Sequence, residues 1–350
     1  MIFHGKEISM ALPIWRDEYI SLGTGASTTF RISIAFGDDD RIVYNGVAKR
    51  LPSETEARIK INDIASDYLS NILPTLSQAE FNEIDLPLHM KVEKKVTGST
   101  WEEVAELEFY NDWSYDPNFN PATMGLAFPI NGKIDARQWL IYTAYEQDSI
   151  VANLHFKDGS VNQVIIPISR ENDFNDDYND DFSRSIKSAG SGSVAIDLSQ
   201  WENLVKVVIE NTEYIVDAGC HKYVLHYLNA FGGWDSLIIE GNTTETDEIE
   251  RKERMVNYDN SVMTNRSRRN YRNNITKGYR LHTGWMNDFQ SEMMHHVINS
   301  TDVYLENLEN GTFFPVVITD TSLEYKTFRT QNGLVNYEIN VQVAQERTRR

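Results

Sequence analysis

Cysteine is almost absent from this sequence of 350 residues, which contains a single cysteine, Cys220. One thiol excludes an internal disulfide framework and any zinc site built on cysteines. No recognisable group that would activate a thiol surrounds Cys220, so we expect a buried, inert side chain.

Long apolar runs are also missing. No segment approaches the roughly 18 consecutive apolar residues that a membrane span needs. Residues 1–7 contain neither the apolar stretch nor the small-residue cleavage site of a secretory signal. We therefore expect a chain that interacts with no membrane and is not secreted.

Recognisable catalytic and metal-binding motifs are lacking as well. The sequence has no His-Glu-x-x-His zinc motif and no Gly-x-Ser-x-Gly nucleophile elbow. Residues 23–27 are glycine-rich but lack the Lys-Ser/Thr pair of a phosphate-binding loop. Adjacent helical histidines such as His295 and His296 point about 100° apart and cannot share one ion. We expect no enzyme, no metal ion and no cofactor.

Basic residues are in the minority. The chain has 33 Lys and Arg against 52 Asp and Glu, a formal net charge of −19. The imbalance is concentrated in residues 1–200, where 17 basic residues face 31 acidic ones. Such a chain is self-repelling and a poor binder of nucleic acid or anionic membranes. We expect nucleic acid as a partner only if DNA passes through a channel.

The densest acidic run lies in residues 171–183. Its aspartates are Asp173, Asp176, Asp177, Asp180 and Asp181. The run lacks the glycine at the sixth position that an EF-hand loop requires. We interpret it as a solvated acidic loop, with Ca²⁺ binding as the alternative.

Short alternating segments predict a mainly β fold. Phe30, Ile32, Ile34 and Phe36 recur at every second residue, which places them on one face of a strand. Later strand candidates are separated by only three or four residues, which favours antiparallel meanders over βαβ units. We predict two or three antiparallel β-sandwich-like domains with a few short helices.

Shifts in composition predict three domains. Residues 1–118 form an N-terminal β-rich domain, and residues 119–217 form a central β-sandwich-like domain that carries the acidic loop. Residues 218–350 form a C-terminal β-rich domain. A segment rich in proline and glycine, 116–132, marks the first boundary, and Ser188–Ser193 (Ser-Ala-Gly-Ser-Gly-Ser) is predicted to be flexible.

Two helices and one long loop are predicted within these domains. A short helix is predicted over 63–73, where Ile64, Tyr68 and Ile72 are four residues apart. A second helix is predicted over 285–299, with its apolar face formed by Trp285, Phe289, Met293, His296 and Val297. Between them, residues 241–280 are polar and poor in aliphatic side chains, which predicts a long basic loop.

A hairpin is predicted near residue 232. Gly232 and Gly233 supply the positive φ values that tight turns need, and Trp234 closes the hairpin over a core.

The predicted long loop contains a cluster of basic residues. Its arginines include Arg266, Arg268, Arg269, Arg272 and Arg280, with Tyr258, Tyr271 and Tyr279 interleaved. Arginine with tyrosine can bind nucleic acid through phosphates and stacking. A basic arm can also dock on the acidic surface of a neighbouring copy in a homo-oligomer. We favour the contact between copies, with a plain loop and nucleic-acid binding as alternatives.

Several segments together resemble a known family. They are Ile61-Asn62-Asp63-Ile64, Asp112-Trp113-Ser114-Tyr115-Asp116, Pro129-Ile130-Asn131-Gly132, Leu225-His226-Tyr227-Leu228-Asn229, Gly232-Gly233-Trp234-Asp235 and Phe314-Pro315-Val316-Val317-Ile318-Thr319-Asp320. Their order is similar to that in virion structural proteins of phages of gut Bacteroidales, including crAss-like phages. The resemblance implies a tail or connector protein that works with other tail or connector proteins. It also implies location in the virion after assembly in the host cytoplasm, and it carries over no catalytic residue.

The sequence therefore predicts a phage structural protein that self-assembles into a ring or tube in the tail, portal–tail connector or baseplate. One alternative is a carbohydrate-binding β-sandwich or receptor-binding tip, with Trp113, Trp139 and Trp234 as sugar platforms. A third hypothesis is an acidic glycoside hydrolase.

Overall fold

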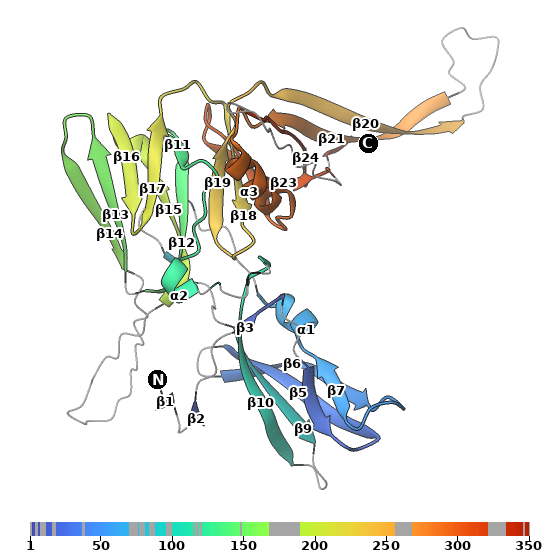
Figure 1. Ribbon diagram of the computed structural model, residues 1–350. Helices are drawn as coiled ribbons and strands as arrows, with labels where there is room; N and C mark the ends of the chain where they lie inside the picture. The colour runs from blue at the N-terminus through green and yellow to red at the C-terminus, as the bar shows by residue number, and fades with distance from the viewer. Residues whose placement is uncertain are drawn as a thin grey trace, which may run out of the picture.

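A computed structural model of the chain describes most of its residues (Figure 1). The described residues are 2–3, 6–7, 12–15, 19–36, 39–69, 76, 81–83, 88–95, 100–114, 116, 119, 121–147, 149–167, 190–255, 268–320, 334–345 and 347–349. They form a mainly β structure of several antiparallel sheets, as predicted. None of the helices in these ranges is long and apolar enough to cross a membrane.

The first sheet belongs to the N-terminal part of the chain and has the strand order β3-β10-β9-β5-β6. Its strands are β3 (Leu12–Pro13), β5 (Ser27–Phe36), β6 (Asp39–Lys49), β9 (Leu88–Lys95) and β10 (Trp101–Tyr110). The pair β4 (Tyr19–Gly23) and β7 (Ala57–Lys60) and helix α1 (Asn62–Ser66) pack against it. A small ribbon of β1 (Ile2–Phe3) and β2 (Lys6–Glu7) lies near the N-terminus.

The core of this part follows from the predicted alternation. Phe30, Ile32 and Ile34 on β5 are all buried. Val92 and Met90 on β9 are the cross-strand partners of Ile32 and Ile34 and are buried with them. One face of the sheet is therefore apolar because every second residue is apolar.

Two further sheets form a sandwich in the middle of the chain. The larger one has the order β11-β17-β16-β13-β14 and the smaller one β12-β15-β8. Their strands are β8 (Phe81–Glu83), β11 (Lys133–Asp135), β12 (Trp139–Gln147), β13 (Ser149–Phe156), β14 (Val161–Pro167), β15 (Gly190–Asp197), β16 (Leu204–Ile209) and β17 (Thr212–Asp217). Short helices α2 (Pro121–Met124) and η1 (Leu198–Gln200) flank them. Leu140 and Tyr142 on β12 share a buried core with Val207 and Ile209 on β16.

The last sheet has eight strands in the order β19-β18-β22-β23-β24-β21-β20, with β25 also paired to β21. They are β18 (Tyr223–Leu228), β19 (Trp234–Ile238), β20 (Thr244–Met255), β21 (Arg268–His282), β22 (Val303–Asn307), β23 (Thr312–Ile318), β24 (Glu338–Val343) and β25 (Arg347–Arg349). β19 at one edge of the sheet and β21 near the other edge come close together, so the sheet is curled. The N–H of Gly241, just after β19, donates to the carbonyl of His282 at the end of β21.

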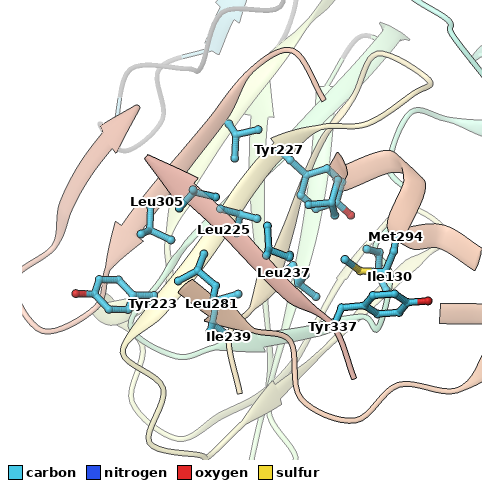
Figure 2. Packing of buried hydrophobic residues seen from close by; sticks show 14 of the residues in the cluster. Ile130, Tyr223, Leu225, Tyr227, Leu237, Ile239, Leu281, Met294, Leu305 and Tyr337 are labelled. Carbon is cyan, nitrogen blue, oxygen red and sulfur yellow. The ribbon is translucent and has the colours of Figure 1, made fainter. Parts of the chain in front are cut away.

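Helix α3 (Asp288–Ile298) packs onto the curled sheet. Figure 2 shows Leu225, Tyr227, Leu237 and Leu305 from the strands converging with Met294 of the helix. Its first turn is closed by a capping box, in which Asn287 accepts from the N–H of Gln290 and Gln290 accepts from the N–H of Asn287. The same box explains why the helix begins at Asp288.

The smaller central sheet has a second apolar face, which joins it to the last sheet. Ile141 and Ala195 on that face pack with Leu228 and Trp234. The N–H of Trp234 donates to Thr143 Oγ1 at 3.0 Å across the same boundary. The central sandwich and the curled sheet are therefore held together by a continuous apolar and polar contact.

Three predictions about local structure are wrong, and a fourth is confirmed with narrower bounds. Residues 241–280 are not a long loop, because most of them form β20 and β21. The helix predicted over 63–73 has ended by Ser66, and residues 70–73 lie outside the described residues. The helix predicted over 285–299 is confirmed, and it spans Asp288–Ile298. The segment predicted to be flexible includes the first residues of β15, starting at Gly190.

The acidic loop predicted over 171–183 lies outside the described residues.

Candidate assembly interface

Strands β20 and β21 form a long antiparallel hairpin that projects from the curled sheet (Figure 1). We call this hairpin the arm, residues 244–255 and 268–282. Twelve residues of β20 correspond to about 40 Å at ~3.3 Å per residue. Every side chain of β20 is exposed. The arm therefore has no core of its own, which explains why its sequence looked like a polar loop.

Ion pairs and a hydrogen bond hold the base of the arm to the rest of the curled sheet. Glu245 on β20 accepts from Lys277 at 2.8 Å, from the Tyr223 hydroxyl at 2.7 Å and from Lys222 at 3.1 Å. The hydrogen bonds from Lys277, Tyr223 and Lys222 lower the pKa of Glu245 to about 2. In turn, Glu245 raises the pKa of Lys277. The carboxylate is thus ionised and paired at any physiological pH.

Away from the base, the arm loses its supporting strands. β24 pairs with β21 over Gly278–His282, and β25 pairs with it over Asn273–Ile275. Among the described strands, β20 is the one that pairs with residues 268–272. Ile249 and Ile275 lie opposite each other across the two strands, and the described residues beyond them are charged or polar apart from Met255 and Tyr271. We call residues 250–255 and 268–272 the distal arm.

The distal arm is basic. It contains six Lys and Arg and two Glu. Arg251, Arg254 and Arg268 are exposed and form no ion pair with the described part of the chain. A β-bulge between Lys252 and Glu253 interrupts the register at this point. The bulge twists the ribbon and changes the direction of its side chains.

The structure separates the five predicted contact arginines. Arg268, Arg269 and Arg272 lie on the distal part of β21, where Arg269 is opposite Arg254. Arg272 donates to Asn274 at 2.9 Å. Arg280 lies at the base instead, in a 3.0 Å ion pair with Glu338 of β24.

Arg266 lies outside the described residues. Arg280 therefore does not belong with the distal basic surface.

The predicted structural hairpin lies where three parts of the chain meet. β18 and β19 pair directly up to Leu228 and Trp234, and Gly232 has φ +86°. Trp234 is fully buried. The N–H of Trp113, just after β10, donates to the carbonyl of Ala230 in this turn at 2.6 Å. The turn thus connects the curled sheet with the end of the N-terminal sheet.

A buried polar group ties the central sandwich to the curled sheet. His226 Nε2 and Glu306 Oε2 are 2.9 Å apart, and both side chains are almost fully buried. Glu306 also accepts from the N–H of Trp139 on β12. Ser236 is the cross-strand neighbour of His226, and its hydroxyl oxygen accepts from Gln138 at 3.2 Å. The side chains of His226, Ser236 and Glu306 are all buried.

The tryptophans proposed as sugar platforms differ in exposure. Trp234 has 0% exposure and cannot serve, which corrects that assignment. Trp139 packs against the apolar boundary between the sandwich and the curled sheet. Trp113 is 45% exposed, with its indole N–H donating to Asn111.

The outer face of α3 departs most clearly from the sequence prediction. Trp285 and Phe289 were placed on the apolar face, yet they are 66% and 69% exposed. The buried side of the helix is formed by Ser291, Met294, His296 and Val297. Met286 pairs with Val335 and is buried, so the adjacent Trp285 points outward. The prediction failed for Trp285 because the helix begins at Asp288, after this residue. It failed for Phe289 because the helix buries a different side.

Cys220 is exposed, contrary to the expectation of a buried thiol. In the described ranges, no three His, Cys, Asp or Glu side chains are arranged to hold a metal ion.

No known protein family, no curated protein and no solved structure matches this chain.

Proposed function

We propose that this chain is a structural subunit that assembles with copies of itself through its arm. The observation that carries the proposal is the exposed hairpin of β20 and β21. An isolated two-stranded ribbon is marginally stable in water, because it buries too little apolar surface. A neighbouring subunit would supply the surface that the distal arm lacks.

Charge supports a contact between identical subunits. The distal arm has an excess of basic residues, whereas the whole chain has a net charge of −19. The basic distal arm of one copy and the acidic body of the next attract each other. Orientations that bring like charges together are disfavoured. The arm and the body are different surfaces, so their contact is heterologous. Such contacts close into rings or continue as tubes.

The sequence resemblance supports a place for this assembly in a phage virion. We place the ring or tube in the tail, the portal–tail connector or the baseplate, beside other tail or connector proteins. Such particles assemble in the host cytoplasm. DNA would meet the protein only by passing through the channel of the assembly.

Electron microscopy of the purified full chain tests the assembly. We expect rings or tubes of uniform diameter. A population of single particles of 40.3 kDa at high protein concentration would overturn the proposal.

Mass spectrometry of purified virions tests the location. A phage that encodes this chain should carry it in the particle at many copies. If the chain appears only in the infected-cell lysate, its assignment to the virion is wrong.

A further inference from the structure

Strand β10 has an open edge along most of its length. One of its sides pairs with β9 from Trp101 to Phe109, whereas β3 covers the other side only at Phe109 and Tyr110. No described strand covers that side of residues 101–108, and Figure 1 shows β10 at the margin of the N-terminal sheet. We call residues 101–108 the β10 edge. The unpaired backbone N–H and C=O groups of an edge strand can accept a further strand.

The β10 edge is acidic. Four of its eight residues are glutamates and none is Lys or Arg; the glutamates are Glu102, Glu103, Glu106 and Glu108. Glu102, Glu103 and Glu108 each have a basic neighbour on β9, at 3.7, 3.4 and 3.2 Å. The side chain of Glu102 is still 60% exposed, and Glu106 is exposed without an ion pair to the described part of the chain. Negative charge therefore remains on the surface beside the unpaired backbone.

Two other strands at sheet edges differ from β10 in charge. β6, at the far side of the same sheet, contains two acidic and two basic residues. β14, at the edge of the larger central sheet, contains no charged residue. Of these three edges, the β10 edge attracts a basic strand most strongly. Two β10 edges would bring glutamates against glutamates, which opposes their pairing with each other.

The distal arm has a matching edge. Residues 268–272 of β21 pair with β20 on one side, and β24 and β25 cover the other side only from residue 273 onward. These five residues contain three arginines and no acidic residue. Arg268 is exposed, as are Arg251 and Arg254 on the neighbouring strand, and none of the three forms an ion pair with the described part of the chain. The distal arm therefore offers both unpaired backbone groups and the charge that the β10 edge attracts.

The arm cannot reach the β10 edge of its own chain. Figure 1 shows the N-terminal sheet on one side of the curled sheet and the arm extending away from that N-terminal sheet. Strands β24 and β25 pair with β21 and fix the direction of its base. A distal arm that meets a β10 edge must therefore come from another copy.

We propose that residues 268–272 of one copy add as a strand to the β10 edge of the next copy. This contact rests on the proposed self-assembly and names the surface that receives the arm. Backbone hydrogen bonds between the two strands provide affinity, and the pairing of arm arginines with glutamates selects this edge over the others. Each copy gives one arm and one edge, so the contact repeats from subunit to subunit.

Reciprocal charge reversal tests the pairing. The arm variant carries R251E, R254E and R268E, and the edge variant carries E102R and E106R. In either variant alone, the distal arm and the β10 edge have charge of the same sign and repel each other. In an equal mixture, the acidic arm meets the basic edge, and the basic arm meets the acidic edge.

We expect each variant alone to sediment as a monomer and the equal mixture to form large assemblies. Each variant should associate with its own copies more weakly than the wild type does, by about tenfold or more. Recovery in the mixture also shows that both variants fold. The control variant E202R/E309R reverses two exposed carboxylates outside the β10 edge and should assemble as the wild type does.

Hydrogen exchange of the full chain tests whether backbone groups take part. The amides of residues 101–108 should exchange about tenfold or more slowly in the wild-type assembly than in the monomeric arm variant, because an added strand protects them. Residues 161–167 of β14 are the internal control and should exchange alike in both. Equal exchange of residues 101–108 in the assembly and in the monomer would overturn the addition of a strand at this edge.

The sedimentation outcomes separate this inference from the proposed function. An edge variant that assembles as the wild type does would overturn the β10 edge as the receiving surface and leave self-assembly intact. Two variants that fail alone and are not rescued by mixing would overturn the pairing of arm and edge. A monomeric wild type would overturn both the pairing and the proposed function.

Discussion

The backbone of Gly233 passes directly against the carbonyl oxygen of Leu126. A Cβ atom built at Gly233 would lie 2.0 Å from that oxygen, closer than any real side chain allows. The neighbouring Gly232 meets the carbonyl of Asn111 in the same way, at 2.4 Å. The two glycines therefore let the turn between β18 and β19 fit between two other segments of the chain.

Replacing Gly233 with alanine should destabilise the protein. The new methyl group must displace the backbone at Leu126, and overpacking of this kind costs about 1–3 kcal/mol or more. Thermal unfolding of G233A should therefore begin at a lower temperature than that of the wild type. G25A is the control, because a Cβ there meets only Thr28 Oγ1 at 3.3 Å and Ser27 O at 3.5 Å. Equal melting temperatures for G233A and G25A would contradict the close approach.

Because His226 and Glu306 form a buried pair, we predict that substituting His226 lowers the free energy of unfolding strongly. H226A removes the hydrogen-bond partner 2.9 Å from Glu306 and leaves this buried carboxylate with the N–H of Trp139, which costs about 3–5 kcal/mol. Urea unfolding should show this as a lower midpoint. K94A breaks the exposed pair with Glu102 and should cost about 1 kcal/mol or less. If both variants lost the same stability, the buried pair of His226 and Glu306 would contribute no more than an ion pair at the surface.

We predict that the free energy of unfolding depends on pH through Asp235. Its side chain accepts from the N–H of Phe128 at 3.1 Å and from Asn229 at 2.6 Å, and burial raises its pKa to about 7. An unfolded aspartate has a pKa of about 3.9. The folded state therefore binds more protons than the unfolded state between about pH 4 and pH 7. The contribution of Asp235 to the free energy of unfolding falls as pH rises through this window.

The variant D235N isolates this contribution. Its side chain does not titrate, so the wild type should lose stability relative to D235N from about pH 4 to pH 7, by at most about 4 kcal/mol. Burial lowers the pKa of His296 to about 3, which gives an opposite trend, but His296 is common to both proteins and cancels. Parallel stability curves for the two proteins over this range would contradict the prediction.

Substitution of the distal basic residues of the arm should weaken assembly, whereas substitution of Arg280 at its base should not. Replacing Arg266, Arg268, Arg269 and Arg272 together with alanine should weaken association by about tenfold or more. Arg280 is a cation on the same strand, but its partner Glu338 belongs to the same chain. R280A should therefore leave the association constant unchanged. Light scattering across a concentration series measures both, and equal losses would argue against a distal contact.

The sequence predicted the strands with an apolar face better than the exposed elements. Alternation identified β5 because Phe30, Ile32 and Ile34 are all buried on one side. The same reasoning missed β20, since strand prediction from alternation needs a core face and β20 has none. The arm was visible only as a long polar stretch.

The candidate site was predicted in part. The arginines of the arm were selected from composition, but pairing with Glu338 separates Arg280 from the others. The exposure of Trp285 and Phe289 was not predicted, because both residues fit a helical apolar period. Trp285 precedes the helix and adjoins Met286, which pairs with Val335, whereas Phe289 lies on the side of the helix away from its buried residues.

Sedimentation velocity of an arm-shortened chain tests the central claim most directly. In this variant, residues 251–273 are replaced by an Asn-Gly turn that joins the paired residues Glu250 and Asn274. We predict that the wild type sediments as a large assembly and that the shortened chain sediments as a monomer with an unchanged melting temperature. A shortened chain that still forms the wild-type assembly would contradict the role of the arm.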